Sequence, residues 1–216
     1  MVINVWKLDV ENSTFDMLAS LDMASSVIWI ERYQDYGQFE LYISAEPEWV
    51  DMFTDGDIFL TKAGSERGMY VETIKLTEDE ESGNYLTITG RSAELMMLWR
   101  AMPFSNFQDS EQFGRYTAER IIRDVMKRWL INDSAIFTND DAIDFLSIEA
   151  SHGWEDYTER QFTGKTVYQV VQDLCSSFQY GFKFVWTGSG FEFQLYKGID
   201  RSFDQTENSY VIFSPD

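Results

Sequence analysis

Residues 85–102 read YLTITGRSAELMMLWRAM, and in this stretch the sequence changes from strands to helices. The first five residues read as a strand. The Gly-Arg step at 90–91 interrupts it, and Ser92 is a plausible N-cap for a helix over 93–102. The helix would place its apolar residues at positions i, i+3, i+4 and i+7, namely Leu95, Leu98, Trp99 and Met102. This spacing indicates core packing rather than a ligand site.

Upstream of this stretch, the first ninety residues read as short strands separated by turn residues. Strands are predicted over 27–30, 39–43, 58–62, 69–77 and 85–89. In the second of these, Phe39, Leu41 and Ile43 share one face, while Glu40 and Tyr42 share the other. Short strands at this spacing suggest a small antiparallel barrel or sandwich.

Downstream, the clearest helix begins after the N-cap residue Thr117. Its apolar stripe comprises Ala118, Ile121, Ile122, Val125, Met126, Trp129 and Leu130. Its opposite side comprises Glu119, Arg120, Arg123, Asp124, Lys127 and Arg128. The basic residues lie toward the C-terminal end, where they complement the helix dipole, and we prefer this explanation to a binding patch.

A further amphipathic helix is predicted from Thr166, with Gln169 as its capping-box partner and Gly181 at its end. Its buried stripe comprises Val167, Val170, Val171, Leu174, Cys175 and Phe178. Residues 131–162, between the two helices, are irregular and polar, and form either a long excursion or a joint between halves.

After the last helix, strands over 182–187 and 191–196 flank Gly188-Ser189-Gly190, which is a hairpin signal. A short apolar strand, Tyr210 to Phe213, follows near the end of the sequence and needs a pairing partner. The order of elements predicts an α+β protein and not a βαβ repeat. We expect three parts: 1–100, β-rich and ending in a short helix; 101–180, helical and irregular; and 181–216, the truncated start of a second β domain.

The charge of the chain is strongly acidic, with 37 Asp and Glu against 17 Lys and Arg and a net charge of −20. A nucleic-acid-binding protein needs a basic face, so we expect no sequence-specific nucleic-acid binding. The acidity serves solubility, or it forms a surface along which a polyanion slides without being held.

The single cysteine, Cys175, excludes an internal disulfide and a cysteine-rich zinc site, and we expect it in the core. No signal peptide is visible, and no apolar run reaches the ~20 residues that a membrane span requires. A soluble protein made in the cytoplasm is therefore expected.

Catalytic candidates are few. The one histidine, His152, lacks a G-x-S-x-G serine to work with, and no phosphate-binding loop is present. The acidic pairs Asp140/Asp141 and Glu155/Asp156 would serve a glycosidase only at a suitable separation across a cleft. The run from Glu78 to Glu81 lacks the spacing of a calcium loop. We therefore predict no catalytic residue, no cofactor and no metal.

Exposed aromatic side chains can stack on sugars, and Trp154 with Tyr157 is the best local candidate for such a site. Most of the 35 aromatic residues must belong to the core or to interfaces, so a carbohydrate-binding site is a secondary hypothesis.

Three passages resemble the tail-hub (baseplate hub) proteins of long-tailed bacteriophages and prophages. Residues 33–41, YQDYGQFEL, resemble the "Y…G-x-F-E-L" hairpin of that family. Residues 90–100, GRSAELMMLWR, resemble its "G-R-S…L-L…R" step. Residues 196–202, YKGIDRS, with 211–214, VIFS, resemble its "Y-x-G-x-D-R…V-x-F-S" passage. The matches fall in family order over residues 33–214.

The resemblance implies two small β-barrel-like, tube-type domains with an inserted helical region, similar to the hub of contractile tails. It implies a structural, non-enzymatic component of the virion tail that forms a ring, expected to be a homotrimer, between the tail tube and the tip. The implied neighbours are a distal tail protein, the tape measure, and receptor-binding or fibre proteins. The alternatives are a tail-associated cell-wall hydrolase with its catalytic module outside this chain, and a host carbohydrate-binding module.

Overall fold

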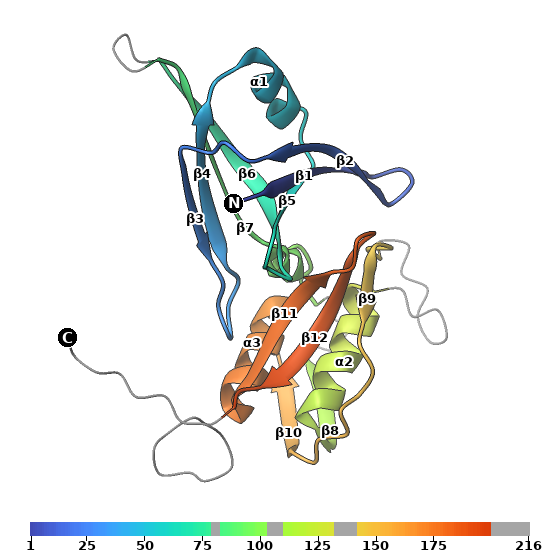
Figure 1. Ribbon diagram of the computed structural model, residues 1–216. Coiled ribbons are helices and arrows are strands. Elements are labelled where there is room, and N and C mark those ends of the chain that lie inside the picture. Colours follow the sequence, from blue (N-terminus) through green and yellow to red (C-terminus); the bar gives the residue numbers. More distant parts are fainter. Residues whose placement is uncertain (79–82, 103–109, 132–141, 200–216) are drawn as a thin grey trace, which may run out of the picture.

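The computed structural model describes residues 1–78, 83–102, 110–131 and 142–199. Its first part is a curled, seven-stranded antiparallel sheet in the order β2-β1-β5-β6-β7-β4-β3 (Figure 1). Its strands are β1 (Ile3–Asp9), β2 (Thr14–Leu21), β3 (Ser26–Ile30), β4 (Gln38–Ser44), β5 (Ile58–Lys62), β6 (Gly68–Thr77) and β7 (Tyr85–Ser92). Every strand predicted in this region is present.

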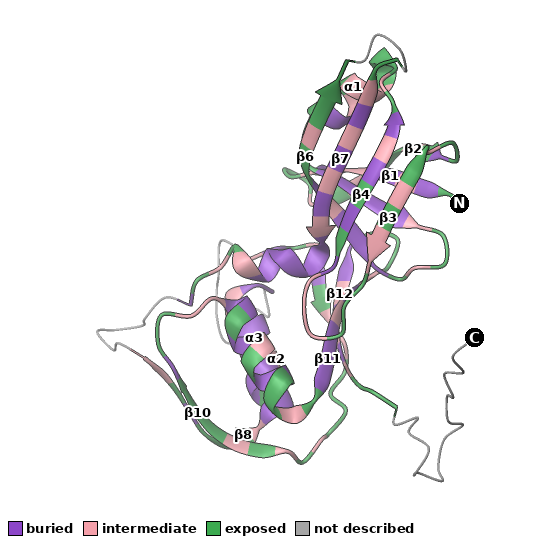
Figure 2. Ribbon diagram, turned by 90° about the vertical axis from the view of Figure 1, so that its left-hand side faces the viewer, coloured by how far each residue is buried: buried purple, intermediate pink, exposed green. Residues whose placement is uncertain are grey.

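One face of this sheet carries its core. Phe39, Leu41 and Ile43 of β4 are buried, as the alternation predicted, and they pack with apolar residues of β1, β5, β6 and β7. Helix α1 (Pro47–Thr54), which we did not predict, adds the buried Phe53 to this core. Buried residues run along the inner strands in Figure 2.

The sheet curls without closing on itself among the described residues. β2 pairs only with β1, and β3 pairs only with β4, so these strands are the two edges. The α+β class is confirmed, whereas the two β-barrel-like domains are not confirmed.

The step after β7 differs from the predicted α-helix. Residues Ala93–Leu98 form the 3-10 helix η1. Leu95 and Met102 of the predicted stripe are buried, but so are Glu94, Met96 and Met97 outside it, while Trp99 is 47% exposed. The Ser92 side chain does not cap this helix. Its Oγ accepts a hydrogen bond of 2.6 Å from the Gly37 backbone N–H and so holds the β3–β4 turn.

The second part packs helices against small sheets. Its elements are β8 (Glu111–Thr117), α2 (Ala118–Trp129), β9 (Leu146–Ile148), β10 (Tyr157–Phe162), α3 (Val167–Phe178), β11 (Tyr180–Trp186) and β12 (Phe191–Lys197). β8 pairs with β10, and the other sheet has the order β11-β12-β9, with β9 parallel to β12. The predicted hairpin is confirmed. The irregular structure predicted over 131–162 is wrong for β9 and β10, and β8 was not predicted.

The caps of the two helices confirm the sequence signals at their starts. Thr117 accepts a hydrogen bond from the Arg120 N–H, and Thr166 and Gln169 form the reciprocal capping box. The predicted end of α3 at Gly181 is wrong, because Gln179 takes the left-handed C-cap conformation with a φ of 56°. Gly181 lies in β11, where the rings of Tyr33 and Tyr196 leave no room for a Cβ.

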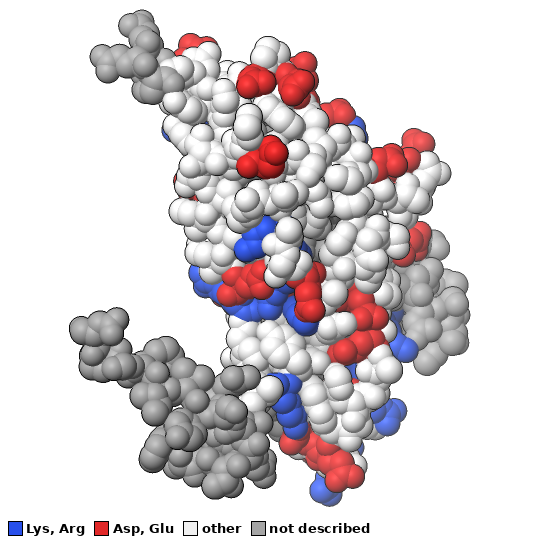
Figure 3. All heavy atoms as spheres, viewed as in Figure 1, with Lys and Arg blue, Asp and Glu red and all other residues white. Residues whose placement is uncertain are grey.

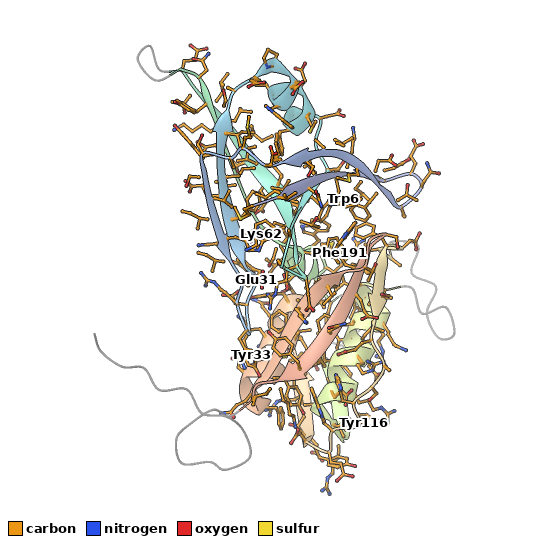
Figure 4. The ribbon with its side chains drawn as sticks, in the orientation of Figure 1. Trp6, Glu31, Tyr33, Lys62, Tyr116 and Phe191 are labelled. Carbon is orange, nitrogen blue, oxygen red and sulfur yellow. The ribbon has the colours of Figure 1, made fainter. Side chains whose placement is uncertain are left out.

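Aromatic rings join the two parts into one packed structure. The Phe15 ring lies 5.3 Å from that of Phe59 and 4.9 Å from that of Trp186, measured between centroids. Trp6 packs on Trp186 at 4.9 Å, and Phe191 lies below them, as Figure 4 shows for the labelled Trp6 and Phe191. The β1–β2 hairpin thus contacts the β11–β12 hairpin directly.

The predicted strand from Tyr210 to Phe213 lies outside the described residues. The outer edge of β11 is already occupied, because the Phe182 N–H donates to the Tyr33 carbonyl and the Trp186 N–H to the Glu66 carbonyl. β12 lies between β11 and β9. None of the described helices is both long and apolar enough to cross a bilayer.

Candidate assembly interface

The first open edge of the seven-stranded sheet is β2. Its side chains Met17 and Leu18 are 51% and 41% exposed. The register with β1 shifts here, since Val5 pairs with Ala19 and Trp6 with Met17, which leaves Leu18 as an extra residue in a bulge. An eight-residue edge with exposed apolar side chains is suited to pairing with another chain.

The second open edge is β3, at the other end of the same sheet. Ile28 is 49% exposed there. Lys62 lies 5.3 Å above the neighbouring Trp29 ring, and the Trp29 Nε1–H donates to Glu31 at 3.0 Å. These contacts fix the side chains beside the edge.

A groove of about 430 Å³ runs beside β3, over strands β4, β6 and β7. Gly90 is one of its lining residues. A Cβ at this position would overlap the Tyr70 carbonyl oxygen and lie 2.8 Å from the Phe39 ring. Arg91 binds both carboxylate oxygens of Glu72, at 2.8 and 2.5 Å. That pairing raises the pKa of Arg91. The β3 edge therefore lies beside a groove in which the Arg91–Glu72 ion pair is held in place.

The β3–β4 turn fastens the edge strands to the second part of the molecule. The Tyr33 hydroxyl donates to the Gln179 carbonyl at 2.8 Å and accepts from the Gly198 N–H at 2.7 Å. Its ring meets that of Tyr196 edge-on at 5.1 Å. Figure 4 shows Tyr33 pointing from the sheet into the second part.

The next two turn residues add four further hydrogen bonds, one of them from Gln172 Nε2 to the Gln34 carbonyl at 3.3 Å. Gln34 Nε2 donates to the carbonyls of Cys175 and Tyr180, at 3.1 and 2.9 Å. The Tyr168 hydroxyl donates to Asp35, and the pKa of Tyr168 is raised by burial and then by this carboxylate. The turn therefore fixes the orientation of β3 and β4 relative to α3.

A buried ion pair lies at the same junction. Arg67 Nη1 lies 3.1 Å from Glu94 Oε1, and the two side chains are 5% and 0% exposed. Arg67 Nη2 also donates to the Arg32 carbonyl at 2.7 Å, and Glu94 Oε1 accepts from the Phe184 N–H at 3.1 Å. Burial raises the pKa of Glu94, and the Arg67 charge opposes that rise. The pair links the residue before β6 with η1, β11 and the β3–β4 turn.

A second buried carboxylate organises the loop before β10. Glu119, predicted on the polar side of α2, is 1% exposed, which corrects that prediction. Its carboxylate accepts from Ser151 Oγ at 2.8 Å, the His152 N–H at 2.6 Å and the Trp154 N–H at 3.0 Å. Burial raises its pKa, but these hydrogen bonds outweigh burial and leave the pKa below the ordinary value.

Two of the catalytic candidates considered from the sequence, His152 and Asp156, contact neighbouring elements of the fold. His152 stacks on Trp154 at 4.5 Å, and its Nε2 lies 3.0 Å from Glu149 Oε1 and 2.9 Å from the Leu195 carbonyl oxygen. Asp156 accepts from Lys197 at 2.8 Å and from the Tyr180 hydroxyl at 2.5 Å, and these bonds lower its pKa. Glu155 is exposed and does not share these contacts.

The two aromatic residues weighed as a sugar platform, Trp154 and Tyr157, have different neighbours. Trp154 is covered by His152 and by Lys197, whose Nζ lies 4.8 Å from its ring. Tyr157 lies on β10 under Arg115 instead. Cys175 is fully buried, as predicted, and burial raises its pKa. Asp140/Asp141 and most of the run from Glu78 to Glu81 lie outside the described residues.

The remaining charges form no cluster of three or more metal-ligating side chains within the described residues. Figure 3 shows carboxylates over the upper part of this face, while Lys and Arg gather at the level of the junction. The basic residues near the end of α2 have local roles: Arg123 donates to the Glu149 carbonyl and Arg128 pairs with Glu111.

The junction residues were missed as functional residues by sequence reasoning. Two signals were available. Glu94 is a lone carboxylate inside an apolar run, and Tyr33, Gln34 and Asp35 belong to the first of the passages that resemble hub proteins.

Comparison with known proteins identifies the family. The model of the Siphovirus ReqiPepy6 Gp37-like proteins matches residues 3–216, nearly the whole chain. The chain belongs to this siphovirus Gp37-like family. Its membership supports the coarser part of the sequence resemblance, that of a phage tail protein.

Among solved structures, this Gp37-like protein is similar to the 43 kDa tail protein of prophage MuSo2 from Shewanella oneidensis. The TM-score is 0.47 at 13% sequence identity, and the match covers 89% of this chain and 52% of that one. The chain thus spans about half the length of that protein. A search of curated proteins found no match.

Proposed function

We propose that this Gp37-like protein is a structural, non-enzymatic component of the virion tail, which forms a ring at the tip or baseplate hub and connects it to the tail tube. The observation that carries the proposal is the pair of open edges, β2 and β3, at opposite ends of one antiparallel sheet. Different edges that meet head to tail generate a ring when the rotation between copies closes.

Pairing of β2 with β3 of the next copy would satisfy the backbone groups that both edges leave open. It would also cover Met17, Leu18 and Ile28, which are the large apolar side chains exposed on these strands. The hydrogen-bonded β3–β4 turn supports this role, because a ring requires each copy to present its edges at a fixed angle.

The trimeric state and the neighbours rest on the sequence resemblance: a distal tail protein, the tape measure, and receptor-binding or fibre proteins. The net charge of −20 supports a channel along which DNA passes, since like charges disfavour retention of a polyanion. The alternative, a cell-wall hydrolase, would need a catalytic module beyond these residues. Clearing of a cell-wall zymogram by this chain would overturn the proposal of a non-enzymatic, structural role.

Cross-linking tests the ring directly. Cys175 is fully buried, so Met17→Cys with Ile28→Cys places the two accessible thiols on opposite edges. With a short bis-maleimide we expect a ladder of covalent oligomers that ends at the closed ring, and light scattering gives its copy number. The matched controls are Met17→Cys alone and Met17→Cys with Glu155→Cys, whose second site lies on the other part of the molecule.

Two outcomes of the cross-linking experiment would contradict the head-to-tail ring. A dimer from Met17→Cys alone would indicate a symmetric β2–β2 contact and contradict the head-to-tail ring. A strictly monomeric double variant in solutions above 100 micromolar, roughly the range of weak association, would sink the proposal for this chain.

A further inference from the structure

A second pocket lies where the first sheet meets the segment before β9, beside the turn between β1 and β2. Its volume is about 330 Å³. The aromatic rings of Phe59, Tyr70, Trp99 and Phe145 line it, together with aliphatic side chains from the end of β1 and from residues 142–143. Tyr70 meets Phe59 at 5.0 Å and Trp99 edge-on at 5.7 Å, so the rings form a continuous wall.

Two apolar side chains at the rim of this pocket are exposed. Trp99 is 47% exposed and Val10 is 65% exposed, although both belong to residue types that folded proteins tend to cover. An exposed tryptophan beside a cavity is a typical anchor point for a partner.

Two carboxylates flank the same pocket. Asp57 precedes β5 and Asp144 precedes β9, and both are exposed. Within the described part of the chain, neither carboxylate makes a hydrogen bond or an ion pair. The charge of Asp57 acts on the pocket wall, since the pKa of Tyr70 is raised by burial and then by Asp57 and Glu72. Arg100 is the basic residue among the lining side chains, which leaves the lining with a net negative charge.

Rings and carboxylates together select one kind of ligand. A cation is attracted to the face of an aromatic ring, and its apolar stem gains from contact with the rest of the wall. A neutral apolar group would give the two carboxylates no charge partner, and they would repel an anion.

We propose that this pocket binds an arginine or lysine side chain presented by a partner protein, with the cationic head at Asp57 and Asp144 and the stem against Tyr70 and Trp99. The site lies on one copy and does not involve β2 or β3. It therefore holds or fails independently of ring formation.

Binding can be measured on the full chain with Nα-acetyl-arginine N-methylamide as the probe. The indole N–H signals of the seven tryptophans are followed by NMR, and Trp99→Phe identifies the Trp99 signal by its disappearance. We expect a saturable shift of that signal at low salt, which weakens as salt is added. The neutral analogue Nα-acetyl-norleucine N-methylamide is the control ligand.

In the double variant Asp57→Asn/Asp144→Asn, we expect the arginine probe to bind about fivefold more weakly, as for the loss of two partly exposed ion contacts. The matched control Glu155→Gln/Glu159→Gln removes two exposed carboxylates from the other part of the molecule and should leave binding unchanged. Equal binding of the norleucine analogue, an unchanged affinity in the double variant, or a saturable shift with N-acetylglucosamine in place of the arginine probe would each overturn the proposal.

Discussion

At the residue scale, buried charges hold this molecule in one arrangement. Arg67 with Glu94 and Glu119 with its loop are inside the protein because each finds several hydrogen-bond partners there. A buried charge without partners would be strongly unfavourable, so each of these sites depends on its complete set of contacts.

Arg67→Ala should lower the free energy of unfolding by about 3–5 kcal/mol, because it leaves the Glu94 carboxylate buried without its counter-charge. Urea unfolding followed by circular dichroism measures the change. Arg120→Ala is the matched control, since Arg120 is 60% exposed beside Asp124 and should contribute less than about 1 kcal/mol. Equal losses of unfolding free energy in the two variants would show that the buried Arg67–Glu94 pair stabilises the fold no more than an exposed ion pair does.

Glu119→Gln should destabilise the protein by about 2 kcal/mol at neutral pH, because the amide offers one acceptor oxygen to three donors. The pKa of Glu119 is lowered on folding, so its stabilising contribution is present above the ordinary value of 4.5 and is lost as the pH falls through the folded-state pKa. The difference from wild type should therefore shrink in acid.

Urea unfolding at pH 7 and at pH 4 tests the Glu119 prediction, with Asp124→Asn on the same helix as the control. A penalty that stayed constant between the two pH values would rule out the carboxylate as its source.

At the scale of elements, close approach between strands decides where glycine is needed. Gly90 of β7 pairs with Val71 of β6, next to the register shift between Val71 and Thr73. A side chain there would meet the backbone of Tyr70, which cannot move without breaking the ladder. The close pairing of β7 with β6 therefore requires glycine at this position.

Gly90→Ala should destabilise the protein by about 1–3 kcal/mol through overpacking against the Tyr70 carbonyl and the Phe39 ring. Thermal unfolding measures the loss. Gly114→Ala is the control, because nothing lies within 4 Å of a Cβ at that position. A Gly90→Ala protein as stable as the Gly114→Ala protein would refute the steric account.

At the scale of the whole molecule, the core crosses the boundary between the two parts. Leu8 and Phe59 of the first sheet belong to the same hydrophobic cluster as α2, α3 and the β11–β12 hairpin. The aromatic contacts and the β3–β4 turn add to that shared core. Neither part can separate without exposing it.

We therefore expect a single cooperative unfolding transition for the whole chain, because opening the junction would expose Phe59 and break the hydrogen bond from the Phe184 N–H to Glu94. Tryptophan fluorescence and far-ultraviolet circular dichroism should give the same urea midpoint. Two separated midpoints would mean that the shared core does not couple the two parts.

The sequence by itself determined the elements whose signals are local. The alternation in β4, the N-caps of α2 and α3, the capping box at Thr166 and the glycine turn between β11 and β12 were all readable, because neighbouring residues alone create these patterns. The passages at residues 33–41 and 90–100 also led to a phage tail family, and the family match agrees with them.

Only the tertiary structure decided which polar residues are buried and where the strand edges lie. β8, β9 and β10 carry weak local signals and become strands because partners far along the chain satisfy their backbones. The sequence does not show that Glu94 and Glu119 are buried, because the backbone N–H groups that bind them come from distant parts of the chain. The open edges β2 and β3 were likewise invisible, since an edge is defined by the absence of a neighbour within the fold.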